Sequence, residues 1–189
     1  MTHQLTAGLP DDAFASDGLL TKRVLRAAAL ASLAPVGGEL LWDLGAGTGS
    51  ISIEWCRLAQ DNRAVAVERN PERAERIREN AARHGVAAQL TIVESDIAGA
   101  LAGLPAPAAV FVGGGVEEVT LQACWAVLPS GGRLVVHSVT AESDAILVAS
   151  WRTTGGELTR VAVETAEPIG RFTGFRPART VTAWAAVKG

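Results

Sequence analysis

From Leu40 onward, short apolar runs alternate with segments of helical pattern, and this alternation restricts the possible folds more than any other feature. The runs are almost wholly apolar, as strands must be when helices cover both faces of their sheet. Strands that alternate with helices build a parallel sheet. The strands that this pattern predicts are residues 40–44, 64–67, 89–93, 108–112 and 133–137.

The remainder of the chain has a different pattern. Residues 141–153 are expected to form a helix, and residues 158–163 and 181–187 two longer, alternating strands. A loop that contains Gly and Pro joins these two strands, which predicts an antiparallel hairpin rather than another crossover. Ahead of the sheet, we expect a helix over residues 21–33, with residues 16–20 as a loop that leads into it. The sequence therefore predicts an α/β protein.

The segment 71–84 has the clearest helix ends. Asn70 can cap its first turn, Pro71 occupies the first helical position, and Gly85 follows as a left-handed terminator. Its many charged residues are typical of a solvated face. We interpret His84 as a residue of the helix end rather than as a ligand.

Composition limits the class of protein. The chain has 189 residues, of which 48% are hydrophobic and 20% charged, as in an ordinary globular domain. No linker, repeat or low-complexity run divides it. We therefore expect one domain over residues 1–189, with an N-terminal loop and helix (1–39), a cofactor-binding half (40–139) and a substrate-side half that includes the hairpin (140–189). The formal net charge of −3 argues against a nucleic-acid partner.

The cysteines and the first residues of the chain bear on where in the cell the protein is expected. Cys56 and Cys124 lie in apolar stretches without metal-ligand spacing, so we expect neither a metal site nor a disulfide framework. Residues 1–4 show no basic segment followed by an apolar one, and no apolar run approaches the roughly 20 residues of a membrane span. We expect a cytoplasmic protein that does not bind membranes.

A glycine-rich loop, LWDLGAGTGS over residues 41–50, follows the first expected strand. Glycines let the backbone turn tightly and let a ligand approach the main chain. The dinucleotide fingerprint needs Gly or Ala where this chain has Ser50, which disfavours a nicotinamide-dependent oxidoreductase. Asp43 would repel a pyrophosphate but suits a ligand with an ammonium and a sulfonium group. S-Adenosylmethionine is such a ligand.

Acidic residues also follow the next two expected strands. Glu68 can accept hydrogen bonds from ribose hydroxyls, and Asp96 can accept one from an adenine amino group. All three acids fall at the carboxyl edge of the sheet, where open α/β folds bind ligands. The cofactor-binding residues expected here are Asp43, Gly45, Ala46, Gly47, Thr48, Gly49, Glu68, Arg69, Asp96, Ile97 and, after the fourth strand, Gly113.

On these residues the chain resembles the class I S-adenosylmethionine-dependent methyltransferases from Leu40 to Val187. The resemblance implies their Rossmann-like fold, a seven-stranded, mostly parallel sheet whose sixth and seventh strands form an antiparallel hairpin. The motifs DGLLTKR at 17–23, GGG at 113–115 and RFTGFRP at 171–177 are similar to those of the precorrin methyltransferases of cobalamin biosynthesis. Within that family, the chain looks most like the decarboxylating carbon-15 enzymes.

The resemblance implies an activity, namely S-adenosylmethionine-dependent methylation of a precorrin tetrapyrrole at carbon 15, with loss of carbon dioxide from an acetate side chain. It also implies a homotetramer and places Thr21 against the cofactor. The family commonly has Asp where this chain has Glu68, a longer carboxylate that can still reach a ribose diol. The motif at 171–177 is closest to enzymes fused to a carbon-5 methyltransferase domain, and it implies such a domain in the full-length protein.

A polycarboxylate substrate gives a role to four basic residues, Lys22, Arg23, Arg171 and Arg176. Their side chains could pair with its acetate and propionate groups. The alternative for each of the two basic clusters is a solvated surface. The clusters are Lys22, Arg23 and Arg26, and Arg171, Arg176, Arg179 and Lys188.

The loop after the fourth strand and the end of the fifth strand complete the expected substrate site. Gly114 and Gly115 would leave room for a wide, flat substrate, and the alternative is a tight turn. His137 is a candidate proton shuttle, and the alternative is a strand-end histidine held by backbone groups.

Other functions share the same cofactor half. A tRNA adenine-N1 methyltransferase should show a basic surface or an extra domain, and a protein isoaspartate methyltransferase should show its own substrate loop. The alternative that is not an enzyme is a non-catalytic, cofactor-binding subunit of a larger methyltransferase. Methyl transfer by the isolated chain would exclude it.

Overall fold

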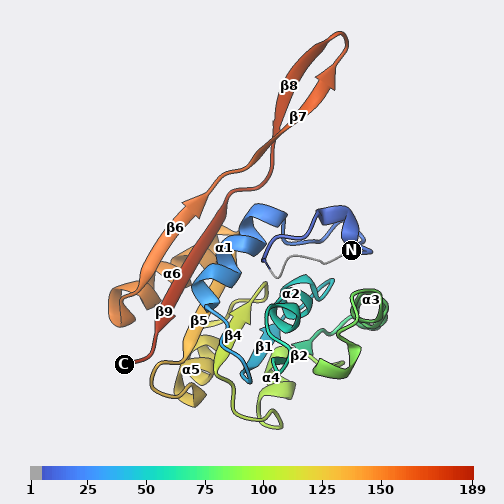
Figure 1. The fold of residues 1–189 in the computed structure, drawn as a ribbon. Helices are drawn as coiled ribbons and strands as arrows, with labels where there is room; N and C mark the ends of the chain where they lie inside the picture. The colour runs from blue at the N-terminus through green and yellow to red at the C-terminus, as the bar shows by residue number, and fades with distance from the viewer. Residues whose placement is uncertain (1–5) are drawn as a thin grey trace.

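The computed structural model describes residues 6–189, in which helices cover both faces of a seven-stranded sheet (Figure 1). The prediction that rests on residues 1–4 falls outside the described residues. The strand order is β3-β2-β1-β4-β5-β9-β6. The strands are β1 (Leu40–Leu44), β2 (Arg63–Val67), β3 (Leu90–Val93), β4 (Ala109–Val112), β5 (Arg133–Ser138), β6 (Glu157–Val161) and β9 (Val181–Val187).

Strand direction confirms the predicted fold class. The strands β1 to β5 pair in parallel, and β9 lies antiparallel between β5 and β6. Each expected strand is present with its ends shifted by two residues at most, because apolar runs bounded by turn residues fix strands locally. The carboxyl ends of β1 to β5 therefore lie along one edge of the sheet.

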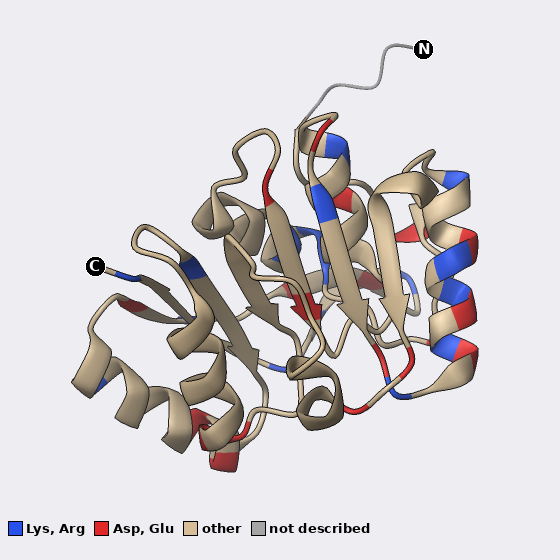
Figure 2. Ribbon diagram, turned by 90° about the horizontal axis from the view of Figure 1, so that it is seen from below, with Lys and Arg blue, Asp and Glu red and all other residues tan. Residues whose placement is uncertain are grey.

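The helices pack on the sheet in two groups. Apolar residues of α1, α2 and α3 share a core with one face of the sheet, and those of α4, α5 and α6 share a core with the other face. In Figure 2 the charged residues are concentrated on α3, whereas the strands carry few. None of the helices within residues 6–189 is both long and apolar enough to cross a membrane. The helices are η1 (Asp11–Ala13), α1 (Arg23–Leu33), α2 (Ser50–Leu58), α3 (Pro71–Arg83), η2 (Ala87–Gln89), α4 (Ile97–Leu101), α5 (Glu118–Val127) and α6 (Ala141–Thr154).

Helix α3 begins where the sequence predicts and ends one residue earlier, at Arg83. The Asn70 side chain accepts a hydrogen bond from the Arg73 amide at 3.1 Å, and Pro71 begins the helix. His84 follows the last helical residue, and Gly85 has a φ of +72°. The His84 ring contacts the Ala13 carbonyl oxygen at 3.0 Å, so it joins the helix end to the N-terminal segment.

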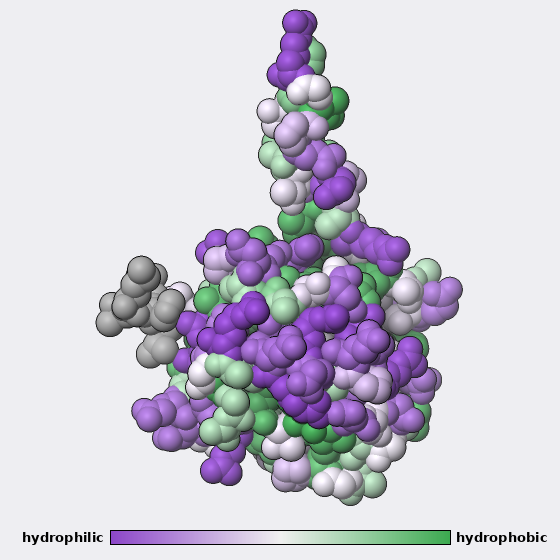
Figure 3. All heavy atoms as spheres, turned by 90° about the vertical axis from the view of Figure 1, so that its right-hand side faces the viewer, coloured by the Kyte–Doolittle hydropathy of each residue, from purple (hydrophilic) through white to green (hydrophobic). Residues whose placement is uncertain are grey.

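The segment between β6 and β9 is not the loop that we expected. It forms an antiparallel ribbon of β7 (Glu164–Ile169) and β8 (Phe172–Pro177), joined at Gly170, whose φ is +58°. This ribbon, residues 164–177, is called the arm below. Figures 1 and 3 show it extending clear of the rest of the molecule. Pro168 is tolerated in β7 because a two-stranded ribbon has free edges.

The arm exposes large apolar side chains. Ile169, Phe172 and Phe175 are each at least 60% exposed. Register places Ile169 beside Phe172 on one face and Phe175 beside Ala166 on the other. Both faces of the arm are therefore apolar in part and uncovered within this chain.

A buried ion pair holds the N-terminal segment. Arg26 is fully buried, and its guanidinium donates to the carboxylate of Glu54 on α2. It also donates to the carbonyl oxygens of Leu9 and Thr21 and lies 4.8 Å from the centre of the Phe14 ring. Arg26 is therefore not the solvated residue that its basic cluster suggested. Residues 8–21, called the strap below, are wrapped around this pair.

We expect Glu54→Gln to lower the free energy of unfolding by about 3–5 kcal/mol, because it leaves the buried Arg26 guanidinium with only the partly exposed carboxylate of Asp11, 3.2 Å away, as a counter-charge. Urea unfolding of this variant and of the wild type measures the difference. The matched control is Glu94→Gln, which removes the partner of Arg78 in an exposed pair, where solvent screens the interaction. Equal losses in the two variants would contradict the role of the buried pair.

Candidate functional site

Two glycine-rich loops meet at the carboxyl edge of the sheet. Gly45, Gly47 and Gly49 have φ values of +73°, +60° and +72°, which other residues rarely adopt. A Cβ atom at Gly45 would lie 3.2 Å from the Gly114 carbonyl oxygen, and one at Gly113 would lie 3.2 Å from the Gly45 carbonyl oxygen. Side chains at Gly45 or Gly113 would force the loops apart, so both glycines are needed for the turn.

The next two glycines of the loop after β4 differ in their surroundings. A Cβ atom at Gly114 would meet no atom of residues 6–189 within 4 Å. One at Gly115, whose φ is +66°, would lie 3.7 Å from Cδ1 of Ile97. Of these three glycines, Gly114 is the one with open space beside it, and its role toward a flat substrate stays a prediction.

Asp43 is a buried carboxylate with one unpaired oxygen. It is 1% exposed, and Oδ2 accepts hydrogen bonds from the Ser52 amide at 3.1 Å and the Ser52 hydroxyl at 2.6 Å. Oδ1 has no partner among the described residues. Burial raises the pKa of Asp43 to about 6, and the charge of Glu68 adds to this. A buried acceptor without a donor fits a ligand that brings an ammonium group.

Glu68 is held in place by the loops around it. It is 5% exposed, and its two carboxylate oxygens accept hydrogen bonds from the Gly47 amide at 2.9 Å and the Asn70 amide at 3.0 Å. A carboxylate oxygen can accept more than one hydrogen bond, so a ribose diol can still bind. Arg69, the next residue, is exposed.

Asp96 caps a helix. Its Oδ1 accepts a hydrogen bond from the Gly99 amide at 2.7 Å at the start of α4, and the residue is exposed. The carboxylate keeps free acceptor capacity toward solvent for an amino group. Ala46 and Thr48 complete the glycine loop, where the Ala46 amide donates to the Val67 carbonyl oxygen at 3.0 Å.

The strap lies over the glycine loop. The Leu19 carbonyl oxygen is 3.6 Å from where a Cβ atom of Gly47 would stand, and Thr21 is half-buried two residues further on. Asp17 pairs with Arg73 at 2.8 Å and with Arg76 at 3.3 Å. The hydrogen bond from Arg73 lowers the pKa of Asp17 to about 2. The strap is thus fastened to α3 beside the loop.

The four basic residues expected at the substrate lie in two places. Lys22 precedes α1 and pairs with Asp11 at 3.8 Å, and Arg23 is exposed. Arg171 and Arg176 are on the arm. The Arg171 guanidinium lies 5.0 Å from the centre of the Phe172 ring, and Arg176 is 3.2 Å from Glu167. The fold of one chain does not bring these arginines together with the glycine loop.

His137 lies below the sheet edge rather than on it. It is 7% exposed, and its ring is edge-on to Phe111 at 5.1 Å between centroids. Within residues 6–189 its ring makes no hydrogen bond, and burial lowers its pKa to about 4. It lines a groove of about 110 Å³ between α1 and the strands β5, β9 and β6. The backbone partner considered as its alternative role is not found, and a proton-transfer role stays a prediction.

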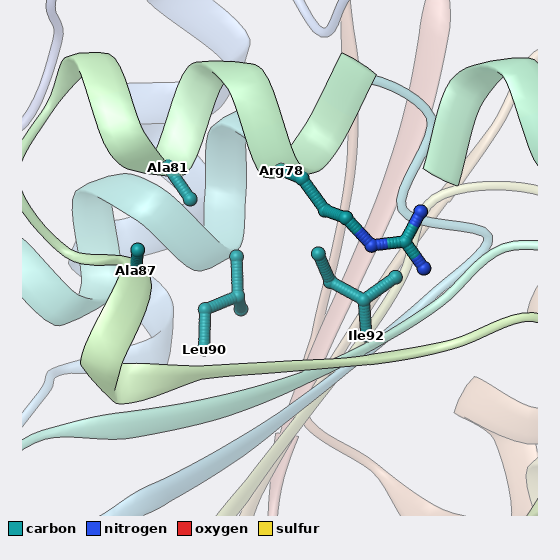
Figure 4. Close-up of a pocket in the computed structure, with 5 residues that line it drawn as sticks. All are labelled: Arg78, Ala81, Ala87, Leu90 and Ile92. Atoms are coloured by element: carbon teal, nitrogen blue, oxygen red, sulfur yellow. The ribbon is translucent and has the colours of Figure 1, made fainter. Parts of the chain in front are cut away.

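A shallow hollow of about 270 Å³ lies elsewhere, between α3 and β3 (Figure 4). Arg78 extends across Ile92 at its rim in this view. None of the expected site residues lines it. The residues that line it are Arg78, Ala81, Ala87, Leu90 and Ile92.

Comparison with known proteins identifies the family. The family model described as a precorrin methyltransferase domain matches residues 12–188. The chain belongs to the precorrin methyltransferase family. This membership decides against the tRNA and isoaspartate methyltransferases and against the oxidoreductase.

Three members of this precorrin methyltransferase family show how far the similarity extends. A precorrin-6Y C(5,15)-methyltransferase [decarboxylating] of a Sinorhizobium species is 47% identical over 98% of this chain, and the chain spans 45% of that protein. The crystal structure of the C-terminal domain of precorrin-6Y C5,15-methyltransferase from Rhodobacter capsulatus is 39% identical, with a TM-score of 0.93, and covers 98% of this chain and 100% of that domain. A probable cobalt-precorrin-6B C(15)-methyltransferase (decarboxylating) of Pyrobaculum aerophilum is 31% identical, with 93% of both chains covered.

We expect Asp43→Asn to stabilise the free protein above pH 6, by about 3 kcal/mol. The native carboxyl keeps its proton up to about pH 6, whereas the unfolded one loses it near 3.8, so wild-type stability falls as pH rises through this window. An asparagine has no charge to desolvate. Urea unfolding between pH 4 and 8 measures the difference.

The matched control for Asp43→Asn is Asp61→Asn, which removes an exposed carboxylate at the opposite edge of the sheet. Its stability relative to the wild type should stay constant over the same pH range. A constant difference for Asp43→Asn as well would contradict the buried, unpaired charge.

Proposed function

We propose that this chain is an S-adenosylmethionine-dependent methyltransferase that methylates carbon 15 of a precorrin tetrapyrrole and releases carbon dioxide from its acetate side chain. The observation that carries the proposal is the unpaired Oδ1 of buried Asp43 beside the glycine loop, in a member of the precorrin methyltransferase family. The relative from Pyrobaculum aerophilum supports the carbon-15 assignment, because this chain spans nearly all of it.

The residues of the sheet edge fit the cofactor. Asp43 would pair with its ammonium group, Glu68 would accept from the ribose, and Asp96 with Ile97 would hold the adenine. When bound, S-adenosylmethionine supplies an electrophilic methyl group on its sulfonium. The protein would contribute by holding the substrate carbon in line with this methyl group, which can lower the reaction barrier by roughly 7–11 kcal/mol.

The substrate would lie over the open side of Gly114. Decarboxylation breaks the bond between the acetate methylene and its carboxylate, and the electron pair passes into the macrocycle. An apolar surrounding favours this loss because it removes water from the carboxylate. The methylene carbon that loses the carboxylate needs a proton to become a methyl group. His137, whose pKa burial lowers to about 4, would relay this proton from water, accepting it at one ring nitrogen and donating from the other. Lys22 and Arg23 would bind the remaining carboxylates.

The protein would work as a homotetramer in which the arm joins the copies. An isolated two-stranded ribbon is marginally stable in water, and this one exposes Ile169, Phe172 and Phe175. Packing against another copy would cover these side chains. It would also carry Arg171 and Arg176 to a substrate site on that copy, which accounts for their distance from the glycine loop.

Two further proposals concern the full-length protein and its location in the cell. Because the chain spans less than half of the Sinorhizobium enzyme, we expect the full-length protein to carry a second domain for carbon-5 methylation. A cytoplasmic location stays a prediction, supported by two buried, free thiols, Cys56 and Cys124.

The activity can be tested with the purified chain, S-adenosylmethionine and a precorrin-6B-type tetrapyrrole, with product mass as the readout. We expect one methyl group gained and one carbon dioxide lost. Methylation alone would place the decarboxylation elsewhere. An unchanged tetrapyrrole, with cofactor binding shown by calorimetry, would contradict the proposed activity, and the remaining readings would be another substrate or a non-catalytic, cofactor-binding subunit.

The arm can be tested by the double variant Phe172→Asp and Phe175→Asp. We expect light scattering to show a tetramer for the wild type and smaller species for the variant, because charges on the arm oppose burial. Val36→Asp is the matched control, since Val36 is 62% exposed on the body of the molecule. A tetramer that survives the double variant would contradict assembly through the arm.

A further inference from the structure

Helix α3 carries an amide on its apolar face. Its buried residues are Ala74, Ile77, Asn80 and Ala81, and Asn80 is 0% exposed. A side-chain amide in apolar surroundings destabilises the fold unless its donors and acceptor are paired. Here each of them is paired.

The partners of Asn80 come from two different segments. The Ala15 amide donates to Oδ1 at 2.8 Å, and Nδ2 donates to the Ala15 carbonyl oxygen at 3.0 Å. Nδ2 also donates to the Thr48 carbonyl oxygen at 3.1 Å. Ala15 belongs to the strap and Thr48 to the glycine loop, so one side chain joins the segment above the cofactor edge to the loop that forms it.

A second contact shows that α3 supports the glycine loop. A Cβ atom at Gly49 would lie 2.7 Å from Cγ2 of Ile77, one turn before Asn80 on the same face. The loop therefore rests directly on α3. The strap continues from Ala15 to Leu19, whose carbonyl oxygen lies 3.6 Å from where a Cβ atom of Gly47 would stand.

We propose that Asn80 is a positioning residue for the cofactor, because it sets the separation between the glycine loop and the strap. The inference rests on the proposed binding of S-adenosylmethionine at this edge. Only a carboxamide offers an acceptor and two donors in this arrangement. An aspartate would place a carboxylate against the Ala15 and Thr48 carbonyl oxygens, with no hydrogen to give either.

The test measures S-adenosylmethionine binding by calorimetry and thermal unfolding of the same samples. Asn80→Asp should weaken binding by about ten-fold or more, the loss expected when two hydrogen bonds that organise a site no longer form. The matched control is Asn62→Asp. Asn62 is equally buried and donates to the Trp55 carbonyl oxygen at 3.2 Å, but it lies at the amino end of β2. It should lower the melting temperature and leave the affinity unchanged.

A second variant keeps the test valid if Asn80→Asp does not fold. Ala15→Pro removes the amide that donates to Asn80 and leaves α3 intact. It should weaken binding of S-adenosylmethionine and speed hydrogen exchange in residues 16–20. In steady-state assays, both variants should raise KM for S-adenosylmethionine more than they lower kcat.

The outcomes separate this inference from the proposed function. Wild-type affinity in Ala15→Pro and in folded Asn80→Asp would overturn the positioning role and leave the cofactor assignment standing. Equal weakening in Asn62→Asp would also overturn it, because general destabilisation would then account for the effect. A wild-type chain that does not bind S-adenosylmethionine would overturn the proposed cofactor, and this inference with it.

Discussion

The path of the N-terminal segment depends on the buried pair of Arg26 and Glu54. Moving two charges out of water costs free energy. Their attraction offsets this cost only when hydrogen bonds also satisfy the donors and acceptors that the pair itself leaves free. The strap provides acceptors for the remaining N–H groups of Arg26, the carbonyl oxygens of Leu9 and Thr21. The pair can therefore form only with the strap wrapped around it. The ion pair thereby fixes the path of residues 8–21, which ends over the glycine loop.

The sheet edge beside this strap contains a second buried carboxylate, that of Asp43, and the protein pairs only one of its two oxygens. Ser52 donates twice to one oxygen of Asp43, and the other oxygen has no partner among residues 6–189. Such a group weakens the free protein and strengthens a complex with a cation, as is usual where function and stability compete. The buried charge at Arg26 is fully paired, whereas the one at Asp43 is not.

The sheet could be predicted from the sequence, because each strand is set by local apolar runs and turn residues. The arm could not, since Pro168, Gly170 and Gly174 indicate a loop and its strands pair without a core behind them. The burial of Arg26 could not be predicted either, because its partner Glu54 is 28 residues away in the sequence. Asn80 and Ser52 were missed, although Asn80 sits at the spacing of the apolar face of α3, a signal that periodicity alone could have found.

The two halves of the proposed reaction differ in how far one chain completes them. The cofactor edge is built from backbone turns and buried side chains, all held by contacts within one copy. The basic residues proposed to bind the substrate are exposed, and Arg171 and Arg176 lie on the arm. If the arm packs on a second copy, the substrate site is finished only in the assembly. Cofactor binding would then persist in a separated chain, whereas affinity for the tetrapyrrole would depend on protein concentration.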